Sequence, residues 1–168
     1  METEDADSPL EPRLPTLDDL LFLGRSLNEA GAKYIVIGGW AIIQHGFERT
    51  TSVIDLLVES SPENFEKIKA AMLKLPDGAI RELEPDDLDK FIVVRVGDEF
   101  VIDLMKRSCG IEYAEASRDI ELIRVNEVDI PFANAQLLWR TKQTGREKDV
   151  LDRAFLVELL KQHDGGKP

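Results

Sequence analysis

Two aspartates stand inside apolar runs of the sequence, where an ionised side chain is costly unless something binds it. Asp55 lies in the run 53–59, and Asp103 lies in the run 100–105. An earlier apolar run ends in the paired glycines Gly38 and Gly39, which would let the backbone approach a ligand closely. Two isolated carboxylates together with such a turn predict an oxygen-lined cation site.

The other metal-binding side chains of the sequence restrict the choice of cation. Cys109 is the only cysteine, and His45 and His163 are the only histidines. Neither a disulfide framework nor a zinc cluster of nitrogen and sulfur ligands can be assembled from them. Oxygen ligands favour Mg²⁺ or Mn²⁺, so we expect either ion to be held by Asp55 and Asp103.

The charge of the chain restricts its partners. The net charge is −12, from 21 basic and 33 acidic side chains, so the surface repels polyanions and nucleic acid is a disfavoured partner. Basic residues nonetheless gather at Arg140, Lys142, Arg146 and Lys148, opposed only by Glu147. This stretch is typical of either a local anion site or a solvated helix face.

The first half of the chain alternates helices and strands. Residues 1–15 hold five acids and three prolines and predict a flexible acidic arm. Thr16 begins a helix that Gly31 ends. The apolar runs predict strands over 34–37 and 53–59, and the intervening pattern predicts a short helix over 40–45. A further helix is expected to begin at Ser61 and to end before Pro76.

In the second half of the chain the spacing of apolar residues changes. Strands are expected over 79–83, 91–96 and 100–104, the last two forming a hairpin about Gly97 and Asp98, with 82–89 a solvated loop or a helical turn. The remaining expectations are a helix over 111–117, a hairpin of strands 120–125 and 128–132, helices from Asn134 and Thr144, and a loose tail over 164–168.

This order of elements predicts an α/β fold in which helices pack on a mixed β-sheet, as a single domain over residues 16–163. No apolar run of about 18 residues is present to cross a bilayer, and no basic and apolar leader precedes the domain. We therefore expect a cytoplasmic protein with no membrane partner.

The glycine pair after the first strand, Arg49 before the second, Asp55 within it and Asp103 on a later strand resemble the nucleotidyltransferase superfamily with a DNA polymerase beta-like fold. The most similar groups are the AbiEii-type toxins and the antibiotic nucleotidyltransferases. The resemblance covers roughly residues 30–155 and includes the basic run 142–149, which is similar to one near the end of such domains.

The resemblance implies transfer of a nucleotidyl group from a nucleoside triphosphate to a hydroxyl of an acceptor, which could be a small molecule, an RNA end or a protein side chain. Asp55 and Asp103 would be the catalytic and metal-binding carboxylates, because metal ions must hold the triphosphate and stabilise the developing charge. The implied nucleotide-binding residues are Gly38, Gly39, Arg49, Lys142, Arg146 and Lys148.

The sequence departs from the family pattern at Val53, which stands where the first catalytic carboxylate belongs and shares a strand face with Asp55. A valine removes a charge and a metal ligand, so metal and triphosphate should bind weakly. Either the protein is naturally degenerate, which we favour, or the valine was introduced. We expect nucleotidyl transfer to be reduced or lost. The alternatives are an active transferase with a rearranged metal site and a non-catalytic module that binds a protein partner, as in toxin–antitoxin pairs.

Structural interpretations of the two aspartates compete with this one. Asp55 would then cap a loop or pair with Arg49, and Asp103 would end its strand in a salt bridge with Lys106 or Arg107. A shared site requires instead that the two acids lie side by side on one sheet, facing the diglycine turn.

Overall fold

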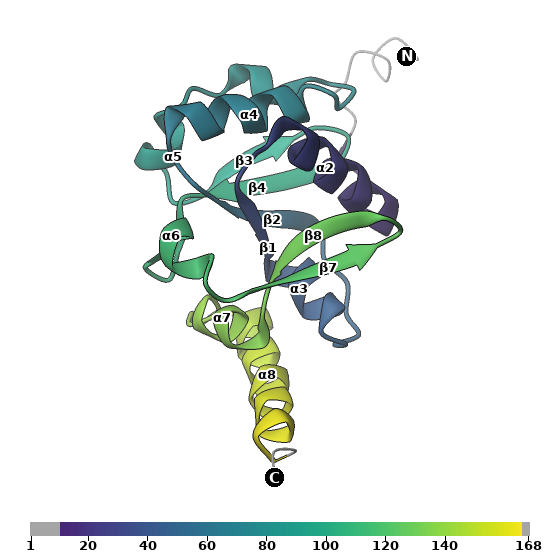
Figure 1. Cartoon of the computed structure of the whole chain (residues 1–168), viewed down its shortest axis with the longest axis vertical. Helices are drawn as coiled ribbons and strands as arrows, with labels where there is room; N and C mark the ends of the chain where they lie inside the picture. Colours follow the sequence, from purple (N-terminus) through teal and green to yellow (C-terminus); the bar gives the residue numbers. More distant parts are fainter. Residues whose placement is uncertain (1–10, 166–168) are drawn as a thin grey trace, which may run out of the picture.

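The computed structural model describes residues 11–165 and contains one six-stranded sheet with the strand order β3-β4-β2-β1-β8-β7 (Figure 1). β2 is parallel to β4 and β1 is parallel to β8, whereas the other three neighbouring pairs are antiparallel. The sheet is therefore mixed, and the expected α/β fold is confirmed. Its strands are β1 (Tyr34–Ile37), β2 (Val53–Val58), β3 (Val94–Gly97), β4 (Val101–Met105), β7 (Ile120–Val125) and β8 (Val128–Ala133).

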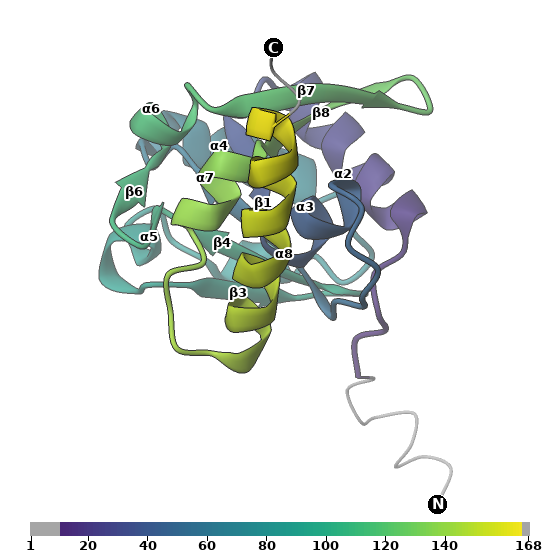
Figure 2. The same ribbon diagram turned by 90° about the horizontal axis from the view of Figure 1, so that it is seen from below.

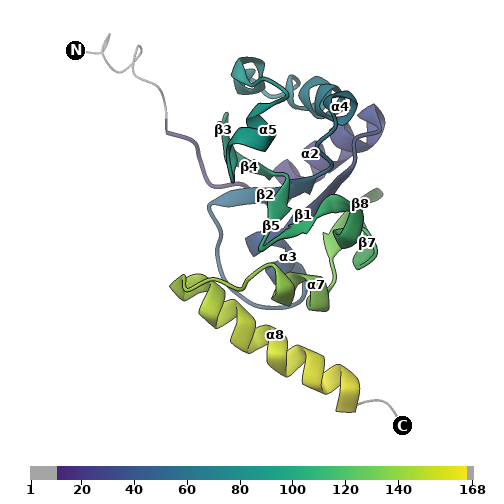
Figure 3. The same ribbon diagram turned by 90° about the vertical axis from the view of Figure 1, so that its left-hand side faces the viewer.

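Helices cover both faces of this sheet (Figure 3). On one side lie α2 (Leu17–Ala30) and α4 (Pro62–Met72), and on the other side lie α3 (Gly38–Gln44), α7 (Ala135–Arg140) and α8 (Glu147–Gly165). Figure 2 views the molecule from the side that carries α7 and α8. Every residue of β1 is buried, because this central strand has a helical layer on both of its faces.

The first helix begins and ends as its sequence predicts. Thr16 and Asp19 form a capping box, and Gly31 ends the helix with a left-handed backbone at φ 73°. The end of the expected acidic arm contacts the domain: Arg13 donates to Asp19 at 2.7 Å, and Pro15 is buried. Residues 1–10 of that arm lie outside the described residues.

The region after α4 differs from the expectation. Residues 79–83 do not form a strand; instead a 3₁₀ helix spans Ala79–Glu82. The reason is Asp98, whose carboxylate accepts the backbone N–H groups of Asp77 and Ala79 and holds this segment as a turn. The acidic stretch contains the helical turn α5 (Asp87–Lys90), and β3 begins only at Val94.

The later elements agree with the sequence more closely. The expected helix over 111–117 is shorter, because β6 (Ile111–Glu112) first pairs with β5 (Arg107–Ser108) before α6 (Tyr113–Ala116) begins. The β7–β8 hairpin is confirmed. α8 continues to Gly165, into the segment expected to be a loose tail, and residues 166–168 lie outside the described residues. No helix within residues 11–165 is long and apolar enough to cross a membrane.

Candidate nucleotide-binding site

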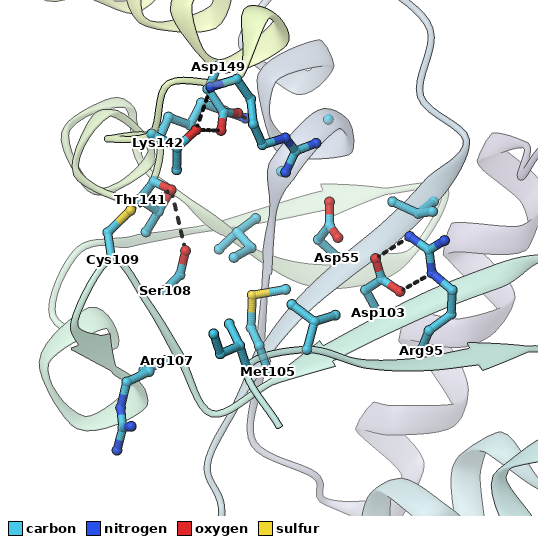
Figure 4. Close-up of a pocket in the computed structure, with 18 of the residues that line it drawn as sticks. Asp55, Arg95, Asp103, Met105, Arg107, Ser108, Cys109, Thr141, Lys142 and Asp149 are labelled. Carbon is cyan, nitrogen blue, oxygen red and sulfur yellow. Dashed lines mark hydrogen bonds and ion pairs between the residues drawn. The ribbon is translucent and has the colours of Figure 1, made fainter. Parts of the chain in front are cut away.

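The two predicted carboxylates lie side by side. Asp55 on β2 is directly opposite Asp103 on β4 in the parallel strand pair, so both side chains project from the same face of the sheet. They line a cavity of about 670 Å³ between the sheet and the segment that joins α7 to α8 (Figure 4). The juxtaposition that the sequence required for a shared site is therefore confirmed.

The diglycine turn faces Asp55, and both of its glycines are needed for close packing. Gly38 has a left-handed backbone, with φ of +69°, and a Cβ added to it would lie 2.1 Å from Oδ2 of Asp55. A Cβ added to Gly39 would lie 2.5 Å from the Cβ of Thr51. Any larger residue would push the start of β2 away from α3, so the glycines bring Asp55 against the turn.

Arg95 binds Asp103 and was not anticipated. Its Nε donates to Oδ1 of Asp103 at 2.9 Å and its Nη2 donates to Oδ2 at 3.0 Å, a bidentate pair (Figure 4). The salt bridges expected for Asp103 as a strand end are wrong, because Lys106 pairs with Asp89 and Arg107 pairs with Glu112.

The sequence contained a signal for Arg95. The run 94–96 alternates apolar, basic and apolar residues, and the β3–β4 hairpin was expected. The register of that hairpin, which places Arg95 opposite Asp103, was the missing step.

The surroundings of Asp55 favour its protonated form. Burial, and after it the neighbouring charge of Asp103, raises the pKa of its carboxyl to about 6 against the opposing charges of Lys142, Arg146 and Arg95. Asp55 therefore exchanges a proton close to neutral pH, unlike an exposed aspartate.

Two of the predicted nucleotide-binding cations bind an acid of α8. Asp152 is fully buried, and its Oδ2 lies 2.9 Å from Nη2 of Arg49 and 2.8 Å from Nζ of Lys142. Lys142 also lies 3.7 Å from Asp149. The alternative pairing of Asp55 with Arg49 is wrong. The burial of Asp152 could not be predicted from the sequence, because an acidic residue in a helix is usually exposed.

The other two predicted cations are accessible. Arg146 precedes α8 and Lys148 lies in its first turn; both side chains are exposed and line the cavity. Among the described residues neither makes an ion pair. Arg146 and Lys148 are thus available to an anionic ligand.

The cavity has the opposite charge balance from the chain as a whole. Its lining contains eight basic and four acidic side chains, although the protein carries a net charge of −12. A positively lined concave surface concentrates anions even when the total charge is negative. The basic residues are Arg49, Lys90, Arg95, Lys106, Arg107, Lys142, Arg146 and Lys148, and the acidic ones are Asp55, Asp89, Asp103 and Asp149.

The residues present do not fit a pair of catalytic metal ions. Val53 is opposite Val101, so the next position on the face of the two aspartates is apolar on both strands. Both oxygens of Asp103 already accept hydrogen bonds from Arg95. Within the described part of the chain, no group of three or more histidine, cysteine, aspartate or glutamate side chains is placed to hold a metal ion.

Comparison with known proteins supports the fold. No family model matches the sequence, and no curated protein matches it. Among solved structures, the chain is similar to a Thermotoga maritima protein that is provisionally described as a nucleotidyltransferase, with a TM-score of 0.52 over 90% of this chain and 93% of that one. The sequence identity is 12%, so the likeness concerns the fold alone. The protein has a nucleotidyltransferase-like fold.

Proposed function

We propose that this protein binds a nucleoside triphosphate in the cavity beside Asp55 and Asp103, and that its capacity for nucleotidyl transfer is reduced or lost. The observation that carries the proposal is the meeting, in one cavity, of the paired acids, the diglycine turn and the exposed cations Arg146 and Lys148.

The phosphates are assigned to the basic part of the lining. Phosphate oxygens accept strong charge-assisted hydrogen bonds from guanidinium and ammonium groups. Arg146 and Lys148 can make such bonds without breaking an existing ion pair, whereas Lys142 is already held by Asp152. We therefore assign the main phosphate contacts to Arg146 and Lys148, with Lys142 adding a positive field from below the surface.

The nucleobase is assigned to the apolar rim of the same cavity. Phe91 and Ile92 line it and are 57% and 85% exposed, which is unusual for side chains of this size. An exposed aromatic ring offers a flat surface on which any base can stack. This arrangement favours a nucleotide without selecting one base strongly.

Nucleotidyl transfer should be reduced because few residues of the site are available to bind a metal ion. Transfer to a hydroxyl needs cations that bridge the phosphates and help the attacking oxygen lose its proton. Val53 supplies no ligand, and Arg95 holds Asp103. A Mg²⁺ or Mn²⁺ ion on Asp55 and Asp103 would first have to displace Arg95, so any such ion is expected to bind weakly.

Nucleotide binding is tested by calorimetric titration of ATP, GTP, CTP and UTP into the purified chain in the presence of Mg²⁺. The double variant Arg146→Gln/Lys148→Gln should bind about tenfold more weakly or worse, because two charge-assisted contacts are lost. The control Lys33→Gln/Lys67→Gln makes the same change in net charge on the other side of the sheet, next to α2 and on α4. Equal weakening by both double variants would refute the assigned site.

Transfer is tested separately, with radiolabelled triphosphates, Mg²⁺ or Mn²⁺ and a panel of hydroxyl acceptors. We expect little labelled product from the wild-type chain. Substantial labelling that disappears in Asp55→Asn would instead establish an active transferase with a rearranged metal site.

A further inference from the structure

We propose that Arg95 takes the place of a divalent cation on Asp103, so that the cavity binds the phosphates of its nucleotide without a metal ion. The inference deepens the proposed function and rests on it for the ligand. It concerns which group balances the negative charge of Asp55 and Asp103, because the nucleotidyltransferase-like fold does not determine that group.

Arg95 and Asp103 form a bidentate ion pair. Nε and Nη2 of Arg95 donate to the two separate oxygens of Asp103, at 2.9 and 3.0 Å. A guanidinium bound in this side-by-side manner occupies both oxygens at once, which a single Lys could not do. The Asp103 side chain is only 8% exposed, so the carboxylate that Arg95 holds has little contact with solvent.

The strand register fixes Arg95 in this position. Arg95 is directly opposite Asp103 in the antiparallel β3–β4 pair. Its neighbours Val94 and Val96 are buried on the opposite face of the sheet, which directs Arg95 toward the cavity. The cation is therefore tethered in place before any ligand arrives.

Arg95 balances most of the negative charge on this face of the sheet. With Val53 and Val101 apolar, the two aspartates and Arg95 leave at most one net negative charge. A dication prefers several converging carboxylates and gains little from a single uncompensated one. The same arrangement removes most of the repulsion that two acids would exert on a triphosphate.

Arg95 keeps hydrogen-bond donors for a ligand. Its Nη1 takes no part in the pair with Asp103, and its side chain is 64% exposed while lining the cavity. A guanidinium has five N–H donors, so one edge can hold Asp103 while another binds a phosphate oxygen. Arg95 thus bridges the acid and the phosphates, which is the geometric task of a metal ion.

The first experiment measures Mn²⁺ binding without nucleotide, by electron paramagnetic resonance of the free ion. The wild-type chain should show no saturable binding, whereas Arg95→Gln should bind Mn²⁺ saturably because Asp103 is released. Arg95→Gln/Asp103→Asn should lose that gain. Arg124→Gln is the matched control, since Arg124 pairs with Asp129 across the antiparallel strands at the other edge of the sheet.

The second experiment measures ATP affinity in EDTA and in Mg²⁺. Wild-type affinity should agree within about twofold in the two buffers, whereas Arg95→Gln should bind about tenfold more weakly in EDTA and recover when Mn²⁺ is added. Thermal unfolding of each variant verifies that the fold is retained.

The outcomes separate this inference from the proposed function. Wild-type ATP binding that requires Mg²⁺ would overturn the role of Arg95 and leave nucleotide binding intact. Wild-type Mn²⁺ binding as tight as that of Arg95→Gln would also overturn it. A chain that binds ATP in neither buffer would overturn both proposals.

Discussion

Gly38 packs directly against the carboxylate of Asp55, and the space between them cannot hold a methyl group. A Cβ on Gly38 would lie 2.1 Å from Oδ2 of Asp55, far inside van der Waals contact. The diglycine turn and the acid on β2 are therefore a single packed unit, and the position of the acid depends on the absence of a side chain opposite it.

Gly38→Ala should destabilise the domain more than its backbone conformation alone explains. Gly31 is the control, because it has nearly the same backbone, φ of +73° against +69°, with no atom within 4 Å of an added Cβ. Gly31→Ala should lower the free energy of unfolding by about 1 kcal/mol, from the strain of a left-handed alanine. Gly38→Ala should cost roughly 2 kcal/mol more, from the clash with Asp55. Urea unfolding measures both values, and equal losses would show that the contact with Asp55 is easily relieved.

Asp152→Asn should be strongly destabilising. The side chain is fully buried between Arg49 and Lys142, so neutralising it leaves Arg49 without its counter-charge and Lys142 with only Asp149, 3.7 Å away. Breaking a buried ion pair in this way typically costs about 3–5 kcal/mol. Glu158→Gln, on the same helix with an exposed partner Lys161, should change stability by less than about 1 kcal/mol. Chemical denaturation checks both variants, and a small effect of Asp152→Asn would mean that water already compensates these charges.

Asp55 should make the stability of the protein depend on pH. Its pKa in the folded domain is about 6, above the ordinary value of 3.8, so the folded state holds more protons than the unfolded chain between these values. Protonated Asp55 therefore contributes fully to the free energy of unfolding below about pH 4. This contribution, at most roughly 3 kcal/mol, is lost as the pH rises to about 6.

Asp55→Asn isolates this contribution, because asparagine does not titrate and the other carboxylates are common to both chains. The free energy of unfolding of the variant, relative to wild type, should increase from pH 4 to pH 6 and then level off. Urea unfolding at several pH values within this window provides the measurement. A difference that stays constant across the window would contradict the raised pKa.

Val53→Asp should restore a response to divalent ions. The new carboxylate would lie on the face of Asp55 and Asp103, and without a metal ion its repulsion should lower the melting temperature. Added Mn²⁺ should raise the melting temperature of this variant and strengthen its binding of ATP by about tenfold. Val93→Asp adds the same charge elsewhere in the cavity lining and should show no such response. Full transferase activity in the wild-type chain would remove the premise of this prediction.

The sequence predicted the centre of the site because its signals are local and periodic. Apolar runs identified β2 and β4, and the period of two residues along a strand placed Asp55 and Asp103 on definite faces. The diglycine turn followed from its position at the end of β1. These elements depend on residues close in sequence, so pattern alone suffices.

The ion pairs around the site could not be predicted in the same way. The partner of Asp103 depends on the register of the β3–β4 hairpin, since a shift of one residue would turn Arg95 to the opposite face. The partner of Arg49 depends on how α8 crosses the sheet, which no local pattern specifies. The prediction of a strand over 79–83 was wrong for a similar reason. Asp98, 19 positions beyond Ala79, stabilises a turn there by accepting a backbone hydrogen bond.

The hydrogen bond between Arg49 and the buried Asp152 joins positions 103 residues apart. During synthesis, β1, β2 and β4 leave the ribosome well before α8, so the paired acids can form while the wall that carries Lys142 and Arg146 is still missing. Contacts of such long sequence separation are entropically costly and form slowly. The cavity is therefore incomplete until α8 docks, and ATP added to a refolding sample should be captured only in the kinetic phase in which α8 docks.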